Sequence, residues 1–124
     1  MRTKWLLCLH ALLVIGPTAG LLMGADDDEK PKYTIKEVMK KAHKDGLMKK
    51  LADGGGTKAD AEELLDLYKA MAKNKAPKGD AESWKTKTKA LVDAAQNVVD
   101  DKPGARAELM KAANCAECHK AHKP

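Results

Sequence analysis

The chain has 124 residues and a formal net charge of +5, and it contains two Trp, two Tyr and no Phe. This length suits a single domain with a small core, and a core with so few aromatic rings lacks bulk. Basic and acidic residues are mixed along every segment rather than gathered into a basic stripe, which argues against nucleic acid as a partner.

Residues 1–25 have the pattern of a secretory signal peptide: a short basic head, an apolar run over residues 5–15, and then small residues. The apolar run is shorter than the roughly 20 residues of a membrane-spanning helix, so we expect no membrane span after cleavage. Cleavage is expected between Gly20 and Ala25, and it removes Cys8. The mature protein is therefore expected to be exported to the periplasm, with 21 basic residues, 18 acidic residues and a net charge of +3.

Residues 26–33 form an acidic leader without apolar periodicity, and we expect this leader to be flexible. The first helix is predicted from Thr34 to Asp53. Thr34 and Glu37 match a capping box at its start, and Gly54-Gly55-Gly56 would end it.

Three further helices are predicted at short intervals. The second covers residues 58–75, where apolar residues recur at helical spacing. The third begins after the N-cap Asp80 and runs to about Asp101. The fourth opens at Pro103, a residue suited to a first helical turn, and continues into the C-terminal cysteine motif. Four helices of roughly 18–20 residues with short connections predict an all-α fold, an antiparallel up-down-up-down four-helix bundle over residues 34–124.

The mature chain keeps two cysteines, and they lie in the sequence Cys115-Ala116-Glu117-Cys118-His119, which is a C-x-x-C-H motif. On a helix, two thiols three residues apart can each add to a vinyl group of one haem, while the adjacent imidazole reaches the iron. We therefore predict one covalent haem c, attached through Cys115 and Cys118, with His119 as the proximal iron ligand. A buried porphyrin would also supply the bulk that the aromatic-poor core lacks.

The sequence supports two other roles for the motif less well than haem attachment. A thiol oxidoreductase would place C-x-x-C at the start of a helix in an α/β fold, whereas here the motif is expected to close the last helix. A zinc site would need a fourth ligand beside Cys115, Cys118 and His119, and only His43 or His122 is available. We expect His122 to lie on the solvated surface near the chain end.

With this motif at the end of a helical chain, the protein resembles the class II cytochromes c, which include cytochrome c′ and its low-spin relatives. These are four-helix bundles with C-x-x-C-H near the end of the last helix. His122 and Lys123 stand where the family often has an aromatic and a basic residue, and Met39 stands where low-spin members have their sixth iron ligand. Ile35 in place of the usual Arg, and His43 in place of a small residue, depart from the family. Dimerisation through the first two helices is common in the family, so the resemblance leaves a homodimer open.

The residue that faces His119 across the iron decides the expected function. Met39 and His43 are four residues apart and face the same way, with Met39 the favoured distal ligand and His43 the alternative. A ligated iron suits a periplasmic monohaem electron carrier that serves redox partner proteins and is not an enzyme, whereas an open sixth site would admit NO or CO. A peroxidase would need a distal acid–base pair, for which His43 alone is too little. This arrangement predicts a cavity between the first and fourth helices, lined by Met39, His43, Leu109 and Ala112.

Overall fold

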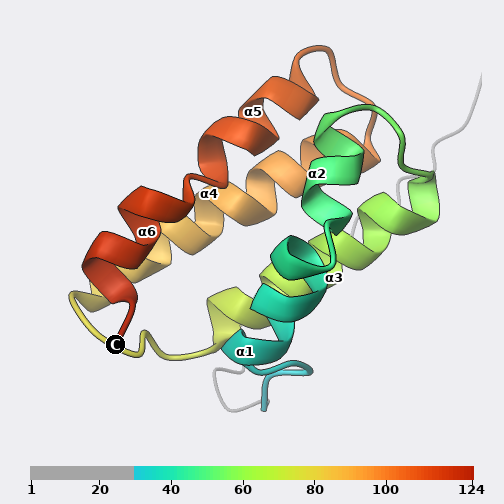
Figure 1. Cartoon of the computed structure of the whole chain (residues 1–124). Coiled ribbons are helices and arrows are strands. Elements are labelled where there is room, and N and C mark those ends of the chain that lie inside the picture. The colour runs from blue at the N-terminus through green and yellow to red at the C-terminus, as the bar shows by residue number, and fades with distance from the viewer. Residues whose placement is uncertain (1–29) are drawn as a thin grey trace, which may run out of the picture.

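The computed structural model describes residues 30–124, and all regular structure in this part of the chain is helical. The elements are α1 (Ile35–Val38), the π-helical turn η1 (Met39–Lys44), α2 (Leu47–Ala52), α3 (Lys58–Lys73), α4 (Ala81–Val99), α5 (Ala105–Ala112) and α6 (Cys115–His122) (Figure 1). The all-α prediction is thereby confirmed. None of these described helices is both long and apolar enough to cross a membrane. The predicted signal peptide with its cleavage site, and the leader up to residue 29, lie outside the described residues.

Local capping interactions explain where three helical segments begin. Thr34 accepts a hydrogen bond from the backbone N–H of Glu37, whose carboxylate accepts one from the Thr34 backbone N–H. Thr57 and Asp60 repeat this capping box at the start of α3. Asp80 caps α4 through its side-chain oxygen. Each cap satisfies backbone donors that the helix itself leaves free, and the predicted starts of these three segments are confirmed.

The first segment is not the single helix predicted from Thr34 to Asp53. After α1 the chain widens into η1, in which the Asp45 N–H donates to the Lys40 carbonyl at 2.8 Å, a bond that spans five residues. Gly46 then takes a φ of +82°, a left-handed conformation that suits glycine and separates η1 from α2. Apolar residues continue on both sides of this break, which is why periodicity alone does not reveal it.

The fourth segment is also divided, and Pro103 lies before it rather than in it. Gly104 precedes α5 with a φ of +77°, and α5 ends at Ala112. Asn114 then caps a new helix, because its side-chain oxygen accepts a hydrogen bond from the Glu117 N–H at 3.2 Å. The prediction of one continuous helix from Pro103 is therefore wrong, and the C-x-x-C-H motif begins a short helix of its own.

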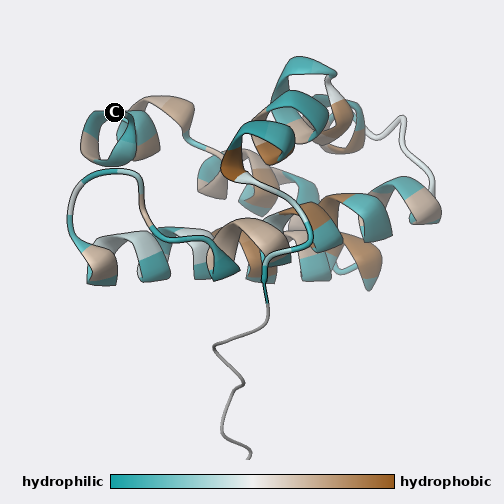
Figure 2. Ribbon diagram, turned by 90° about the horizontal axis from the view of Figure 1, so that it is seen from below, coloured by the Kyte–Doolittle hydropathy of each residue, from teal (hydrophilic) through white to brown (hydrophobic). Residues whose placement is uncertain are grey.

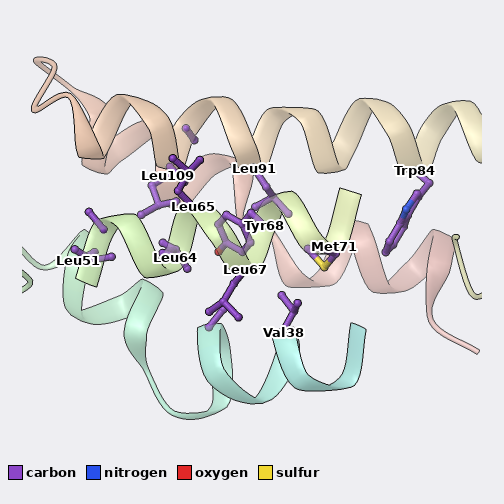
Figure 3. Packing of buried hydrophobic residues seen from close by; sticks show 14 residues of the cluster. Val38, Leu51, Leu64, Leu65, Leu67, Tyr68, Met71, Trp84, Leu91 and Leu109 are labelled. Carbon is purple, nitrogen blue, oxygen red and sulfur yellow. The ribbon is translucent and has the colours of Figure 1, made fainter. Parts of the chain in front are cut away.

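α3 and α4 form a helical hairpin that carries the other elements. α1 and α2 pack on α3, α5 packs along α4, and α2 also contacts α5 (Figure 1). Hydrophobic and hydrophilic residues alternate along the helices (Figure 2). The largest fully buried apolar side chains are Val38, Leu64, Leu67, Tyr68, Met71 and Leu109 (Figure 3). Burying a Val, Leu or Met side chain stabilises a fold by roughly 1.5–3 kcal/mol. α3, which supplies four of these six residues, is therefore the main contributor to the core.

Candidate functional site

The C-terminal motif faces η1 across an open cleft of about 440 Å³. Both walls contribute predicted ligands: Met39 and His43 from η1, and Cys118 and His119 from α6. A smaller adjoining cavity of about 60 Å³ shares these four residues and adds Cys115. Small-molecule sites occupy roughly 300–1,000 Å³, so the cleft has the size of a ligand site. The structure thus brings all five predicted site residues together.

α6 carries one wall of the cleft. Cys115 is the first residue of this helix and is exposed, Cys118 is half-buried, and both thiols are free. Burial raises the pKa of the Cys118 thiol. His119 borders the cleft with an exposed side chain, so its imidazole is accessible to a bound group.

η1 carries the opposite wall. Met39 and His43 are both half-buried there, and residues four apart on a helix face the same way. The His43 ring packs against Tyr68, with ring centroids 5.9 Å apart. Burial lowers the pKa of His43, and electrostatic repulsion from His119, which borders the same cleft, lowers it further. A neutral His43 keeps a ring nitrogen lone pair for a metal.

Tyr68, which packs against His43, is fully buried, yet its hydroxyl has no hydrogen-bond partner among the described residues. Burial raises the pKa of Tyr68, and negative charge at Cys115 would raise it further. A buried hydroxyl without a partner costs on the order of 1–3 kcal/mol. Sequence reasoning finds Tyr68 only as an apolar position of the second helix and gives no sign of this unpaired donor.

One of the four residues predicted to line the cavity lies elsewhere. Ala112 borders the smaller cavity beside Met39 and His43, whereas Leu109 is fully buried in the core. α5 ends at Ala112, and the chain then turns at Asn114 before the motif begins. Because of this interruption, Leu109 packs inside the molecule while the motif borders the cleft.

The structure contradicts the expected solvated position of His122, whose side chain is only 2% exposed. Its Nδ1 lies 2.8 Å from the Lys78 carbonyl oxygen, and its Nε2 lies 3.2 Å from the Ser83 hydroxyl. Its ring meets the Trp84 ring edge-on, with centroids 5.3 Å apart. Sequence reasoning misses this residue because its hydrogen-bond partners lie 39 and 44 residues earlier in the chain.

These observations also bear on the other roles considered for the motif. Both ring nitrogens of His122 are engaged, so His122 is not free to complete a zinc site. Within residues 30–124, no three His, Cys, Asp or Glu side chains are grouped as metal ligands. The motif does open a helix, contrary to expectation and as in thiol oxidoreductases. That helix belongs to an all-α fold, however, whereas a thiol oxidoreductase carries the motif beside a βαβ unit.

A larger hollow of about 600 Å³ lies between α3 and α4. Its floor is partly apolar, with Ala70 and Val92. Its rim is basic and contains Lys30, Lys32, Lys69, Lys73, Lys85 and Lys89. None of the predicted ligands borders this hollow, so we assign the candidate site to the cleft between η1 and α6.

The donor set of the cleft fits a covalently bound haem. Two thiols and an adjacent imidazole lie on one wall, and a thioether and a second imidazole lie on the other. These are the groups with which proteins hold haem c and ligate its iron. Comparisons of the chain with protein-family models, with curated proteins and with solved structures find no match.

Proposed function

We propose that this protein is an exported monohaem c-type cytochrome that carries electrons between redox partner proteins. One observation carries the proposal: Cys115, Cys118 and His119 line a cleft whose opposite wall holds Met39 and His43. Each thiol would add across a vinyl group, forming a carbon–sulfur bond while the thiol hydrogen goes to the neighbouring vinyl carbon. The addition needs no oxidant. The bound haem supplies one-electron chemistry at its iron.

The remaining cleft residues suit this role. Met71, Leu91 and Ala112 give the inner cavity a largely apolar lining, and apolar surroundings exclude water and tune the potential of a bound iron. Lys44 and Lys123 border the outer part of the cleft, where positive charge favours the approach of an acidic partner. The cleft therefore combines a sheltered interior with a charged, accessible edge.

We also propose that the helices form the four-helix bundle of class II cytochromes c, with its first and fourth helices interrupted. Four helical stretches occur in the expected order, over residues 35–52, 58–73, 81–99 and 105–122. The packing of α3 on α4 and of α5 on α4 supports this arrangement. The interruptions fall in the two stretches that face each other across the cleft.

Haem attachment tests the proposed function directly. Expressed with a cytochrome c maturation system, the full chain should yield a processed protein that is heavier by one haem and has the haemochrome spectrum of two thioether bonds. Cys115→Ser and Cys118→Ser should each leave one thioether bond at most, and the double variant should leave none. Lys120→Ala, an exposed position on the same helix, should keep full haem content. A processed protein with a Cys115–Cys118 disulfide and no haem would contradict the proposal.

The alternative function is gas binding at an open sixth site, as in cytochrome c′. The observation in its favour is that Met39 and His43 are only half-buried on a π-helical turn, so packing alone does not hold either side chain toward an iron. The rate at which the reduced protein binds CO distinguishes the two functions. Rapid CO binding by the reduced parent protein would support gas binding and contradict the electron carrier.

A further inference from the structure

α6 holds the proposed haem motif, but few of its side chains anchor it. His122 is the only buried residue of this eight-residue helix. Cys115, His119 and Lys120 are exposed. The placement of α6 therefore depends on the surroundings of His122.

His122 docks α6 on the connection between α3 and α4, beside which the C-terminus lies (Figure 1). A carbonyl oxygen only accepts, so Nδ1 donates to Lys78, and Nε2 is left to accept from the Ser83 hydroxyl. The connection lies so close to α6 that a Cβ at Gly79 would collide with the Ala121 carbonyl oxygen. Gly79 also has a φ of +87°, a second reason for glycine at this position.

The same contacts continue toward the other wall of the cleft. Trp84, in edge contact with His122, donates its indole N–H to the Asn74 carbonyl at 2.8 Å. The Asn74 side chain donates in turn to the Tyr33 carbonyl at 2.9 Å. Tyr33 stands two residues before α1, which leads directly into η1. A connected series of contacts thus joins α6 to the segment that carries the distal side chains.

We propose that His122 is a positioning residue: acting with Trp84 and Asn74, it fixes where His119 lies relative to η1, and hence the ligand geometry of the iron. His122 follows His119 by three residues, about one helical turn, so a shift of one ring moves the other. His122 does not bind the iron itself, because both of its nitrogens are engaged. This role rests on the proposed function.

His122→Phe tests the role because it keeps a ring against Trp84 and removes both hydrogen bonds. In the matured holoprotein we expect the parent's haem content, since Cys115 and Cys118 are unchanged. We expect CO association with the reduced protein to rise about tenfold, because His119 and the distal side chain are no longer held in register. Ser83→Ala removes one of the two bonds and should give a smaller rise.

Asn74→Ala tests the connection from the other side. It removes the hydrogen bond to Tyr33 without altering α6, so a rise in CO association here would show that the series of contacts holds both walls. Val99→Ala is the control for a general loss of stability. Val99 is half-buried at the far end of α4, and its substitution should lower the Tm but leave CO association unchanged.

The outcomes are distinguishable. If His122→Phe has the parent's haem content and CO association rate and only a lower Tm, the positioning role is overturned while the proposed function stands. If His122→Phe yields no folded protein, parent-like CO rates in both Ser83→Ala and Asn74→Ala overturn the role. A parent protein without covalent haem overturns the role and the proposed function together.

Discussion

At the scale of single residues, the cleft offers two side chains for one position opposite His119. The resemblance to class II cytochromes c favours Met39, whereas His43 borders the same cleft as His119, and burial lowers its pKa and so favours the neutral ring that binds metals. The choice sets the chemistry, because Met/His ligation raises the reduction potential of a haem and bis-His ligation lowers it. Met39 as the distal ligand, with His43 as the alternative, stays a prediction.

Spectra of the holoprotein distinguish the two ligands. If Met39 binds the iron, Met39→Ala should abolish the sulfur-to-iron charge-transfer band of the oxidised protein, while His43→Ala should keep it. Met48→Ala, a half-buried methionine of α2 that does not border the cleft, is the matched control and should leave the band intact. A low-spin parent without this band, whose low-spin spectrum is lost in His43→Ala, would identify His43 instead.

At the scale of helices, the starts of α1, α3 and α4 are predictable from the sequence because each is determined by residues within one turn, such as Thr34 with Glu37. The breaks at Gly46 and Asn114 are not predictable in this way. Apolar residues continue across both breaks, and a single Gly or Asn is also found within intact helices. Tertiary packing decides these cases, and both breaks affect the segments that carry the proposed ligands.

Asn114→Ala should destabilise α6 by about 1 kcal/mol, because the Glu117 N–H loses its side-chain acceptor. Native-state hydrogen exchange of the α6 backbone amides measures this loss. Asn114→Asp keeps a capping oxygen and should match the parent. Equal stability of the Ala and Asp variants would show that the cap contributes nothing to α6.

At the scale of the whole molecule, local sequence spacing supports predictions about neighbouring residues, whereas contacts between distant segments leave no local pattern to read. C-x-x-C-H spacing singles out Cys115, Cys118 and His119 without any structure, and the structure places all three beside one cavity, while their role as haem ligands stays a prediction. The buried position of His122 depends on Lys78 and Ser83, and no local pattern links these residues. Likewise, the lack of a hydrogen-bond partner for the buried Tyr68 hydroxyl can be seen only once α3 is packed against its neighbours.

The junction of α2 and α3 should make the stability of the whole protein fall in acid. The Asp60 carboxylate accepts hydrogen bonds from the Lys50 ammonium, whose Nζ lies 2.8 Å from Oδ2, and from the Thr57 backbone N–H. These bonds lower the pKa of Asp60 from 3.8 to about 2. The folded state thus favours the ionised form, so the contribution of Asp60 to the free energy of unfolding is present above pH 3.8 and is lost as the pH falls through about 2. Lys50 is half exposed, so solvent screening keeps the effect small.

Urea unfolding across this pH range measures the contribution. Asp60→Asn should be less stable than the parent near neutral pH, and the difference should shrink as the pH falls through about 2, where the parent's carboxyl becomes protonated in the folded state as well. Glu62→Gln, at an exposed position of the same helix, should show no such convergence. A difference between Asp60→Asn and the parent that persists unchanged at the acid end would exclude ionisation as its cause.

The single buried side chain of α6 also has a consequence for how the protein matures. Elements with few buried contacts open at a much lower free energy than the core that they cover. In the protein without haem, we expect α6 to be the least protected cooperative unit of residues 30–124, opening at Ala113 while α3 and α4 stay folded. In this open state the two cysteines would be accessible to the cytochrome c maturation system. If haem is attached as proposed, the docking of α6 against the bound haem would be the last step of folding.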